Sequence, residues 1–316
     1  RVRPRLVEVI EKVIMIRKVT IDDAEYPKLL KNIHKPPKQL YVNGSLLETD
    51  EVAVALVGSR RASLYGIEMS EKLGYELALR GVTVVSGMAR GIDAAAHRGA
   101  LKAKGRTIAV MGSGHGHIYP TENKKLYEEI VKQGAVITEF EDDMEPLAYN
   151  FPQRNRIISG LSLGVVVIEA AKDSGALITA GLAAEQGREV FALPGKISSS
   201  TSSGTNALIK DGARLVQSVD DILEELQLHE IKPLAPGEEE SVGNRVERMT
   251  KAYVYNSLTG NERKVYKAMS DEPMYIDDIV ASSGIDLASA SKVLLSLQLK
   301  KLILEVPGKQ YVRKEI

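Results

Sequence analysis

Short apolar runs alternate with amphipathic helical patterns between about residue 52 and residue 226. The run Val165-Val166-Val167-Ile168 predicts a buried strand, and the spacing of Met69, Leu73 and Leu77 places three apolar side chains on one helix face. Strands are predicted at 52–57, 82–85, 107–111, 135–138, 165–168, 189–192 and 214–216, and helices at 65–80, 93–103, 122–132, 154–163, 175–186, 205–211 and 219–226. Strands this apolar must be covered on both faces, so the pattern predicts a doubly wound, mostly parallel α/β sheet.

The regions on either side of this pattern differ from it in composition. Residues 1–50 contain Leu40-Tyr41-Val42 and are predicted to form an N-terminal segment that extends the core. Residues 227–257 contain Pro236-Gly237 and a run of three glutamates, which is typical of a linker. The predicted organisation is an N-terminal segment at 1–50, an α/β core at 51–226, a linker at 227–257 and a second domain at 258–316.

The second domain has the pattern of a winged helix. Its apolar spacing and the turn expected at Gly284 predict a helix-turn-helix, and Pro307-Gly308 separates two short apolar runs. The predicted elements are helices over 259–269, 276–282 and 287–301 and a hairpin of strands over 302–306 and 310–312.

Each glycine-rich loop of the core follows a predicted strand. Because open α/β sheets bind ligands at the carboxyl ends of their strands, where helix N-termini present free amides, these loops are expected to form one anion site. Arginine suits such a site because its planar guanidinium can contact a phosphate through two parallel hydrogen bonds. The candidate anion contacts are Gly58, Ser59, Arg60, Arg90, Arg154, Asn155, Arg156, Lys172, Ser174 and Gly175.

Structural roles are the alternative interpretation of several of these residues. Helix caps are expected at Asp93, Thr121, Ser174 and Thr205. Arg154 and Arg156 can instead form surface ion pairs with nearby carboxylates. Those carboxylates belong to Glu139, Glu141, Asp142 and Asp143.

Familiar cofactor and metal signatures do not fit the sequence. Gly112-Ser113-Gly114-His115-Gly116 departs from the G-x-G-x-x-G of dinucleotide enzymes, and Gly195-Lys196 lacks the remainder of a phosphate-binding P-loop. His115 and His117 have no third ligand at useful spacing, so neither a metal nor a cofactor is predicted.

The amino-acid composition limits the class of protein but does not decide whether it binds nucleic acid. Lys plus Arg and Asp plus Glu number 42 each, so a polyanion site must be a local patch. The absence of cysteine excludes disulfides and fits a reducing compartment, and no apolar run approaches the length of a membrane span. A cytoplasmic protein without a membrane partner is therefore expected. The sequence starts at Arg1 without a methionine, so an N-terminal element is expected to have been removed.

The order of motifs along the chain resembles the DprA family of DNA-processing proteins, also called Smf. The motifs cover about residues 40–217 and lie in the family's order. They are Gly58-Ser59-Arg60, Ser86-Gly87 through Asp93, Tyr119-Pro120, Phe151-Pro152, Arg154 through Leu161, Glu169-Ala170, Ser174 through Ala180, Pro194-Gly195 and Gly204-Thr205-Asn206. Histidines in the loop 114–118 depart from the family pattern, and their role is left open.

The resemblance implies an extended Rossmann-like fold with a C-terminal winged helix. It also implies a non-catalytic homodimer that binds single-stranded DNA and loads RecA onto incoming strands in natural transformation. By this resemblance, Arg60 and residues 154–156 are expected to contact DNA. Lys172 is expected to do so because of its position just before Ser174-Gly175. Bases are expected to stack on Tyr65, Tyr119, Tyr149 or Phe151. Auxiliary phosphate contacts are predicted at Lys292, Lys300, Lys309, Arg313 and Lys314 in the winged helix, and contact with another protein is the alternative role of this domain.

A second class of function fits the same sheet edge. The loops can hold a small nucleotide that is sensed, or cleaved at its glycosidic bond with Glu169 as the candidate carboxylate. Competition between an oligonucleotide and a mononucleotide distinguishes the two classes.

Overall fold

The computed structural model describes residues 16–228 and 258–313, apart from positions 271, 301 and 307. The chain divides into two compact units, Arg1–Glu240 and Ser241–Ile316, and each is considered by itself. The predicted linker at 227–257 falls outside the described residues except for its first two positions.

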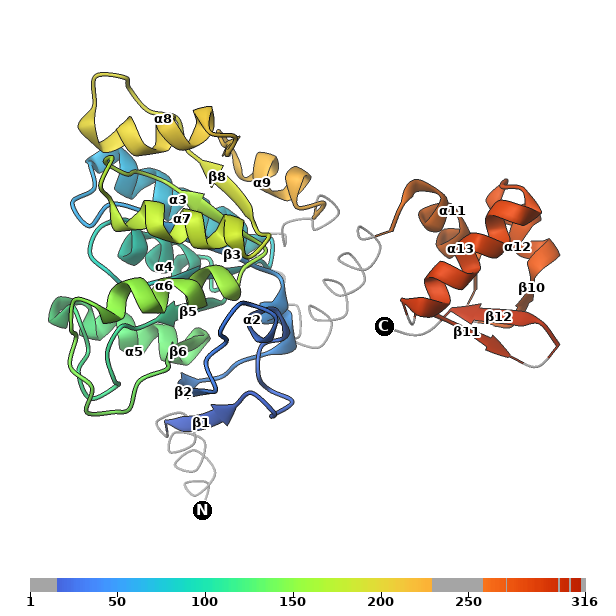
Figure 1. The fold of residues 1–316 in the computed structure, drawn as a ribbon, viewed down its shortest axis with the longest axis horizontal. Coiled ribbons are helices and arrows are strands. Elements are labelled where there is room, and N and C mark those ends of the chain that lie inside the picture. The colour runs from blue at the N-terminus through green and yellow to red at the C-terminus, as the bar shows by residue number, and fades with distance from the viewer. Residues whose placement is uncertain (1–15, 229–257, 271, 301, 307, 314–316) are drawn as a thin grey trace, which may run out of the picture. The chain divides into compact units, whose positions relative to one another are not determined.

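The first unit is built on one sheet, which has nine strands among the described residues (Figure 1). The order across the sheet is β1-β2-β6-β5-β4-β3-β7-β8-β9, with β1, β2 and β6 paired antiparallel and the rest parallel. The strands are β1 (Arg17–Thr20), β2 (Gln39–Gly44), β3 (Ala53–Val57), β4 (Thr83–Ser86), β5 (Thr107–Val110), β6 (Ala135–Thr138), β7 (Gly164–Val167), β8 (Glu189–Ala192) and β9 (Arg214–Leu215). This arrangement confirms the predicted doubly wound, mostly parallel α/β fold.

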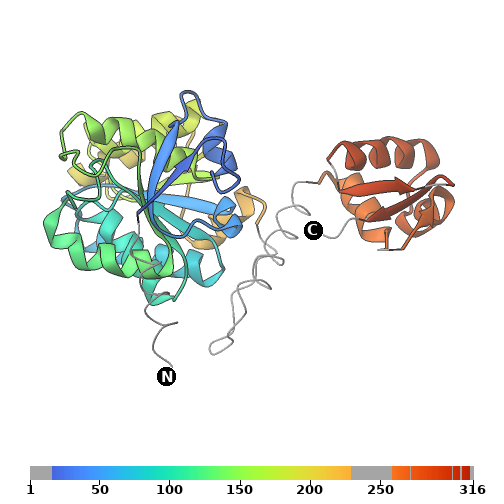
Figure 2. The ribbon, with the colours of Figure 1, turned by 90° about the horizontal axis from the view of Figure 1, so that it is seen from below.

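Helices cover both faces of the sheet, as Figure 2 shows. The α-helices are α2 (Lys28–Lys31), α3 (Leu64–Leu79), α4 (Ile92–Lys102), α5 (Lys124–Gln133), α6 (Asn150–Gly160), α7 (Gly175–Glu185), α8 (Ser203–Lys210) and α9 (Val219–Glu225). Helices α3, α4 and α5 pack on one face, and α6 and α7 pack with α2 on the other. Because both faces are covered, every residue of β3 to β7 is buried, as the apolar runs predicted.

The chain order of the strands fixes where a ligand can bind. From β3 the chain moves outward through β4, β5 and β6, then returns to place β7 on the other side of β3. The connections that leave β3 and β7 therefore diverge to opposite faces of the sheet. A crevice is expected at the carboxyl ends of β3 and β7 because this is the switch point of the topology.

The predicted elements differ from the observed ones in a few places. Helix α6 begins at Asn150, four residues before the predicted start, because Pro152 is tolerated in a first turn whose amides have no helical partner. Strand β1 was not predicted, whereas β2 extends the sheet as expected by pairing with β6.

The predicted helix caps were only partly right. Ser174 caps α7, but Thr205 lies inside α8 and Asp93 lies inside α4, so the cap predictions at these two positions were wrong. Thr121 lies in a short 3-10 helix, Thr121–Asn123, and not at a cap position.

The second unit is a winged helix over its described residues, which confirms the predicted fold of the C-terminal domain. It contains α11 (Gly260–Ala268), α12 (Ile276–Ser283) and α13 (Leu287–Leu299) with a sheet of β10 (Met274–Tyr275), β12 (Gln310–Arg313) and β11 (Ile303–Val306), in that order. Gly284 ends α12 in the left-handed conformation, with φ of 68°, which glycine adopts without steric cost. The core joins α11 to α13 and β11 through buried side chains such as Val265, Leu297 and Ile303.

No single helix among the described residues has the length and apolarity needed to cross a membrane. The bent pair α12 and α13 passes that test only when its two helices are counted together.

Candidate nucleic-acid interface

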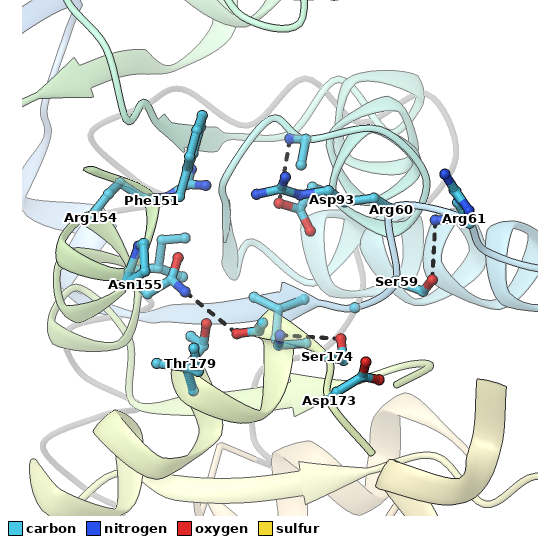
Figure 3. A pocket seen from close by; sticks show the side chains of 18 of the residues that line it. Ser59, Arg60, Arg61, Asp93, Phe151, Arg154, Asn155, Asp173, Ser174 and Thr179 are labelled. Atoms are coloured by element: carbon cyan, nitrogen blue, oxygen red, sulfur yellow. Dashed lines mark hydrogen bonds between the residues drawn. The ribbon is translucent and has the colours of Figure 1, made fainter. Parts of the chain in front are cut away.

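A cavity of about 810 Å³ opens where β3 and β7 end. Its walls come from the loop after β3, the loop after β7, and the start of α6. Figure 3 shows side chains from all three segments around the same space. The predicted contacts that line the cavity are Gly58, Ser59, Arg60, Arg154, Asn155, Ser174 and Gly175.

Arg60 and Phe151 form the exposed cationic wall of this cavity. Arg60 is exposed, and its Cζ lies 5.0 Å from the centroid of the Phe151 ring. The ring stabilises the guanidinium by a cation–π contact. No ion pair involves Arg60 within the described part of the chain, so its donors are available to an anion. Arg61 also lines the cavity, and the sequence analysis missed it, although its position directly after Arg60 was a usable signal.

Arg154 is part of the cavity's inner wall and is only 3% exposed. Its guanidinium donates to the backbone oxygen of Gly87 at 2.6 Å and to that of Val110, so it joins the ends of β4 and β5 to α6. Burial lowers the pKa of Arg154 to about 10, while Asp93 opposes that shift, so the side chain remains charged at neutral pH. A side chain at position 87 would clash, since its Cβ would lie 2.3 Å from Arg154 Nη1.

Asp93 lies close to this buried cation. Its Oδ2 accepts hydrogen bonds from the backbone N–H groups of Gly87 at 3.2 Å and Ala89 at 3.4 Å. Burial raises the pKa of the Asp93 carboxyl, and Arg154 acts in the opposite direction. Asp93 therefore organises the loop after β4 instead of capping α4.

The N-terminus of α7 forms the opposite wall of the cavity. Ser174 Oγ accepts from the amide of Ala176 at 3.3 Å, and Asn155 Nδ2 lies 3.5 Å from the carbonyl oxygen of Gly175. Apart from its chain neighbours and the backbone of its own helix, no atom of the described residues would lie within 4 Å of a Cβ at Gly175, so this first turn is open to a ligand. Free amides and the positive end of the helix dipole favour an anion here.

Three predicted cations do not line the cavity. Arg90 forms an exposed bidentate pair with Glu122, at 2.5 and 2.6 Å. Arg156 donates to both carboxylate oxygens of Glu139, at 2.7 and 2.6 Å, which is the ion pair considered as its alternative role. Lys172 is exposed between two residues that do line the cavity. Contact of these three side chains with DNA stays a prediction.

Glu169 does not line the cavity and is 3% exposed. Its carboxylate accepts hydrogen bonds from the Ser63 amide at 2.8 Å and the Ser63 hydroxyl at 2.6 Å, and its backbone oxygen accepts from the Ser59 amide at 2.8 Å. Both ends of the loop that carries Arg60 are thus fixed by Glu169. Glu169 therefore acts as a positioning residue for this loop. The carboxylate that the sequence suggested for a nucleotide-cleaving enzyme does not face the cavity.

His115 is buried and has hydrogen-bond partners within the fold on both ring nitrogens. Its Nδ1 lies 2.8 Å from the Tyr127 hydroxyl oxygen, its Nε2 lies 3.0 Å from the backbone carbonyl oxygen of Tyr41, and burial lowers the pKa of the imidazole. His117 is exposed and lines a smaller cavity. Within the described residues, no three side chains of His, Asp or Glu are grouped to hold a metal ion.

The auxiliary candidates of the winged helix lie in different surroundings. Lys300 Nζ pairs with Glu262 at 2.9 Å, and the Arg313 guanidinium lies 5.7 Å from the Tyr266 ring centroid. Lys292 on α13 and Lys309 in the hairpin turn are exposed. Their contact with DNA also stays a prediction.

Comparison with protein families matches both units of the chain. The model of DNA recombination-mediator protein A matches residues 17–227, and the DprA winged helix domain matches residues 252–309. The chain is 43% identical to Protein Smf of Escherichia coli over 298 residues, covering 93% of this chain and 76% of the relative. It is 44% identical to DNA processing protein DprA of Streptococcus pneumoniae over 209 residues, covering 66% and 73%.

Solved structures show the same likeness. DNA processing protein A from Streptococcus pneumoniae superposes with a TM-score of 0.63 at 41% identity, covering 69% of this chain and 77% of that one. DNA processing protein A from Helicobacter pylori superposes with a TM-score of 0.60 at 32% identity, covering 67% and 96%. The Helicobacter pylori structure is described as revealing a single-stranded DNA binding mode.

Proposed function

Because the chain belongs to the family of DNA recombination-mediator protein A, we propose that it binds single-stranded DNA as a non-catalytic recombination mediator. The observation that carries the proposal is Arg60, an exposed guanidinium that lies over Phe151 at the mouth of the cavity and forms no salt bridge with any described residue. A phosphate can accept two hydrogen bonds from such a group. Membership of the family and the single-stranded DNA binding mode described for the Helicobacter pylori relative support DNA as the anionic ligand of this cavity.

The cavity supplies contacts to the strand backbone in preference to base edges. Arg60, Arg61 and the first turn of α7 offer cations and amides, whereas Phe151 offers an aromatic ring that any base can stack on. Phosphate contacts fix position but carry no sequence information. Binding is therefore expected to depend on salt and to vary little with base sequence.

We extend the proposal to the biological role that the family implies. The protein acts in the cytoplasm as a homodimer that protects incoming single strands and loads RecA onto them in natural transformation. Family membership supports this assignment.

A second candidate is a mononucleotide sensor or a nucleotide-cleaving enzyme. The volume of about 810 Å³ favours this candidate, because it lies within the range of cavities that hold small ligands. Cleavage would also need a carboxylate beside the ligand. Glu169, the carboxylate suspected from the sequence, instead holds Ser63, whereas Asp93 and Asp173 are the carboxylates that line the cavity.

Binding measurements separate the candidates. A labelled single strand is titrated with the full chain, beside a duplex of matched length and a mononucleotide competitor. We expect the single strand to bind more tightly than the duplex and the mononucleotide to compete only weakly, because several phosphates are bound at once. Equal affinity for strand and duplex would contradict the proposal. Preferential binding of the mononucleotide without dependence on strand length would favour the sensor.

The RecA role has its own test. With the cognate RecA, the protein is expected to speed filament formation on strands coated with single-strand binding protein, and sedimentation is expected to give the mass of a dimer. A folded protein that binds single strands yet leaves the filament lag unchanged would refute RecA loading and leave DNA binding intact.

A further inference from the structure

A smaller cavity of about 340 Å³ adjoins the one described above. It is lined by residues of the loop after β5 and by the start of α5, including His117, Thr121 and Lys124. Tyr119 and Pro146 line both cavities. The two spaces are therefore neighbours that share one wall.

The shared wall continues the aromatic surface of the larger cavity. The Tyr119 ring lies 5.7 Å from the Phe151 ring, centroid to centroid, with 49° between their planes. Arg60 lies over that same Phe151 ring. Tyr119 is itself 42% exposed. Arg60, Phe151 and Tyr119 thus form a continuous row from the larger cavity to the smaller one.

The far side of Tyr119 offers hydrogen-bond donors and a cation. Lys124 is exposed and has no ion pair within the described part of the chain, and the nearby Glu122 carboxylate is occupied by Arg90. Thr121 adds a hydroxyl, and His117 adds an exposed imidazole. A lysine ammonium beside a hydroxyl suits a phosphate oxygen, and an exposed tyrosine ring suits a base.

We propose that the smaller cavity is a second nucleotide subsite for the same single strand, with Tyr119 stacking on a base and Lys124 binding the adjoining phosphate. The subsite rests on the proposed DNA binding in the larger cavity. A strand that enters the larger cavity passes over Tyr119 and then reaches Lys124. Affinity must then rise in a further step once the strand is long enough to reach both cavities.

The test follows affinity against strand length. Dissociation constants of the full chain are measured for oligothymidylates of increasing length, for wild type and Lys124→Ala. Lys125→Ala is the matched control, because Lys125 is the next residue of α5 and is also exposed but does not line the cavity. Circular dichroism of each variant checks the fold.

Short strands are expected to bind wild type and Lys124→Ala equally, since they occupy the larger cavity alone. For longer strands Lys124→Ala is expected to show no further rise in affinity, and its slope of log affinity against log salt becomes shallower by about 0.7, the value for one phosphate on single strands. Lys125→Ala retains the wild-type rise. Tyr119→Ala is expected to weaken binding of long strands by about tenfold, and Tyr119→Phe largely restores it because its ring is kept.

Other outcomes overturn the inference in distinguishable ways. If Lys124→Ala and Lys125→Ala behave alike at every length, or if Lys124→Ala weakens short and long strands equally, the smaller cavity is not a separate subsite. If wild type binds no oligothymidylate at any length, the proposed function itself fails and the subsite falls with it.

Discussion

Arg60→Ala is expected to weaken single-stranded DNA binding by about tenfold or more, since a charge-assisted hydrogen bond contributes about 1.5–3 kcal/mol. The physical reason is the exposure of Arg60 beside Phe151, since no salt bridge holds its guanidinium within the described part of the chain. The slope of log affinity against log salt is expected to become shallower by about 0.7 for each phosphate that the variant no longer binds. The measurement is a titration of one labelled strand at several salt concentrations, repeated with strands of different base sequence.

Two further substitutions make this expectation specific. Arg60→Lys should recover only part of the affinity, because an ammonium keeps the charge but not the planar pair of donors. Arg98→Ala is the matched control, since Arg98 on α4 is exposed but does not line the cavity. Wild-type affinity and slope in a folded Arg60→Ala protein would remove the central interaction of the proposed function.

Substitution of Arg156 distinguishes its two possible roles, an ion pair with Glu139 and a contact with a DNA phosphate. The observed pair with Glu139 predicts that Arg156→Ala lowers stability and leaves the salt slope unchanged. A shallower slope would show instead that Arg156 leaves Glu139 to bind phosphate, as the resemblance implied.

Much of the fold was predictable because the core strands are short, apolar and rich in valine. A run such as that of β7 is apolar at every position, and its length and β-branched side chains favour a strand covered on both faces. Strand β1 escaped prediction because only Val19 of its four residues is fully buried. It lies at the edge of the sheet, where one pairing partner and partial exposure leave little pattern in the sequence.

The location of the candidate site could be predicted from the sequence, but the role of each residue in it could not. Parallel topology alone brings the loops after β3 and β7 to one edge, so Arg60 and Ser174 could be grouped from sequence. Spacing along α6 does not reveal that Arg154 points inward while Arg156 meets Glu139. Those orientations depend on tertiary packing against β4, β5 and the loop after β6.

Arg154→Met is expected to be the most destabilising single change at the site. Methionine fills a similar volume but leaves the carbonyl oxygens of Gly87 and Val110 without their donor. It also removes the buried cation that offsets the charge of Asp93. Leaving a buried polar group without its hydrogen-bond partner typically costs about 1–3 kcal/mol of unfolding free energy.

The pH dependence of stability distinguishes this mechanism from a simple packing defect. Burial already holds the pKa of Asp93 above its ordinary value, and loss of Arg154 raises that pKa further. The folded state of Arg154→Met then binds a proton that the unfolded chain releases above its ordinary pKa of about 4. Its unfolding free energy should therefore fall more steeply than that of wild type as pH rises from about 4 towards neutrality.

Denaturant unfolding of wild type, Arg154→Met and Arg156→Met across that pH range provides the measurement. Arg156→Met is the control, because it breaks a partly exposed pair with Glu139 and should cost much less. A loss of stability in Arg154→Met that is independent of pH would mean that Asp93 does not depend on the arginine. A loss no larger than that of the control would mean that Arg154 does not hold β4, β5 and α6 together, and that its place in the cavity is to be explained by ligand binding alone.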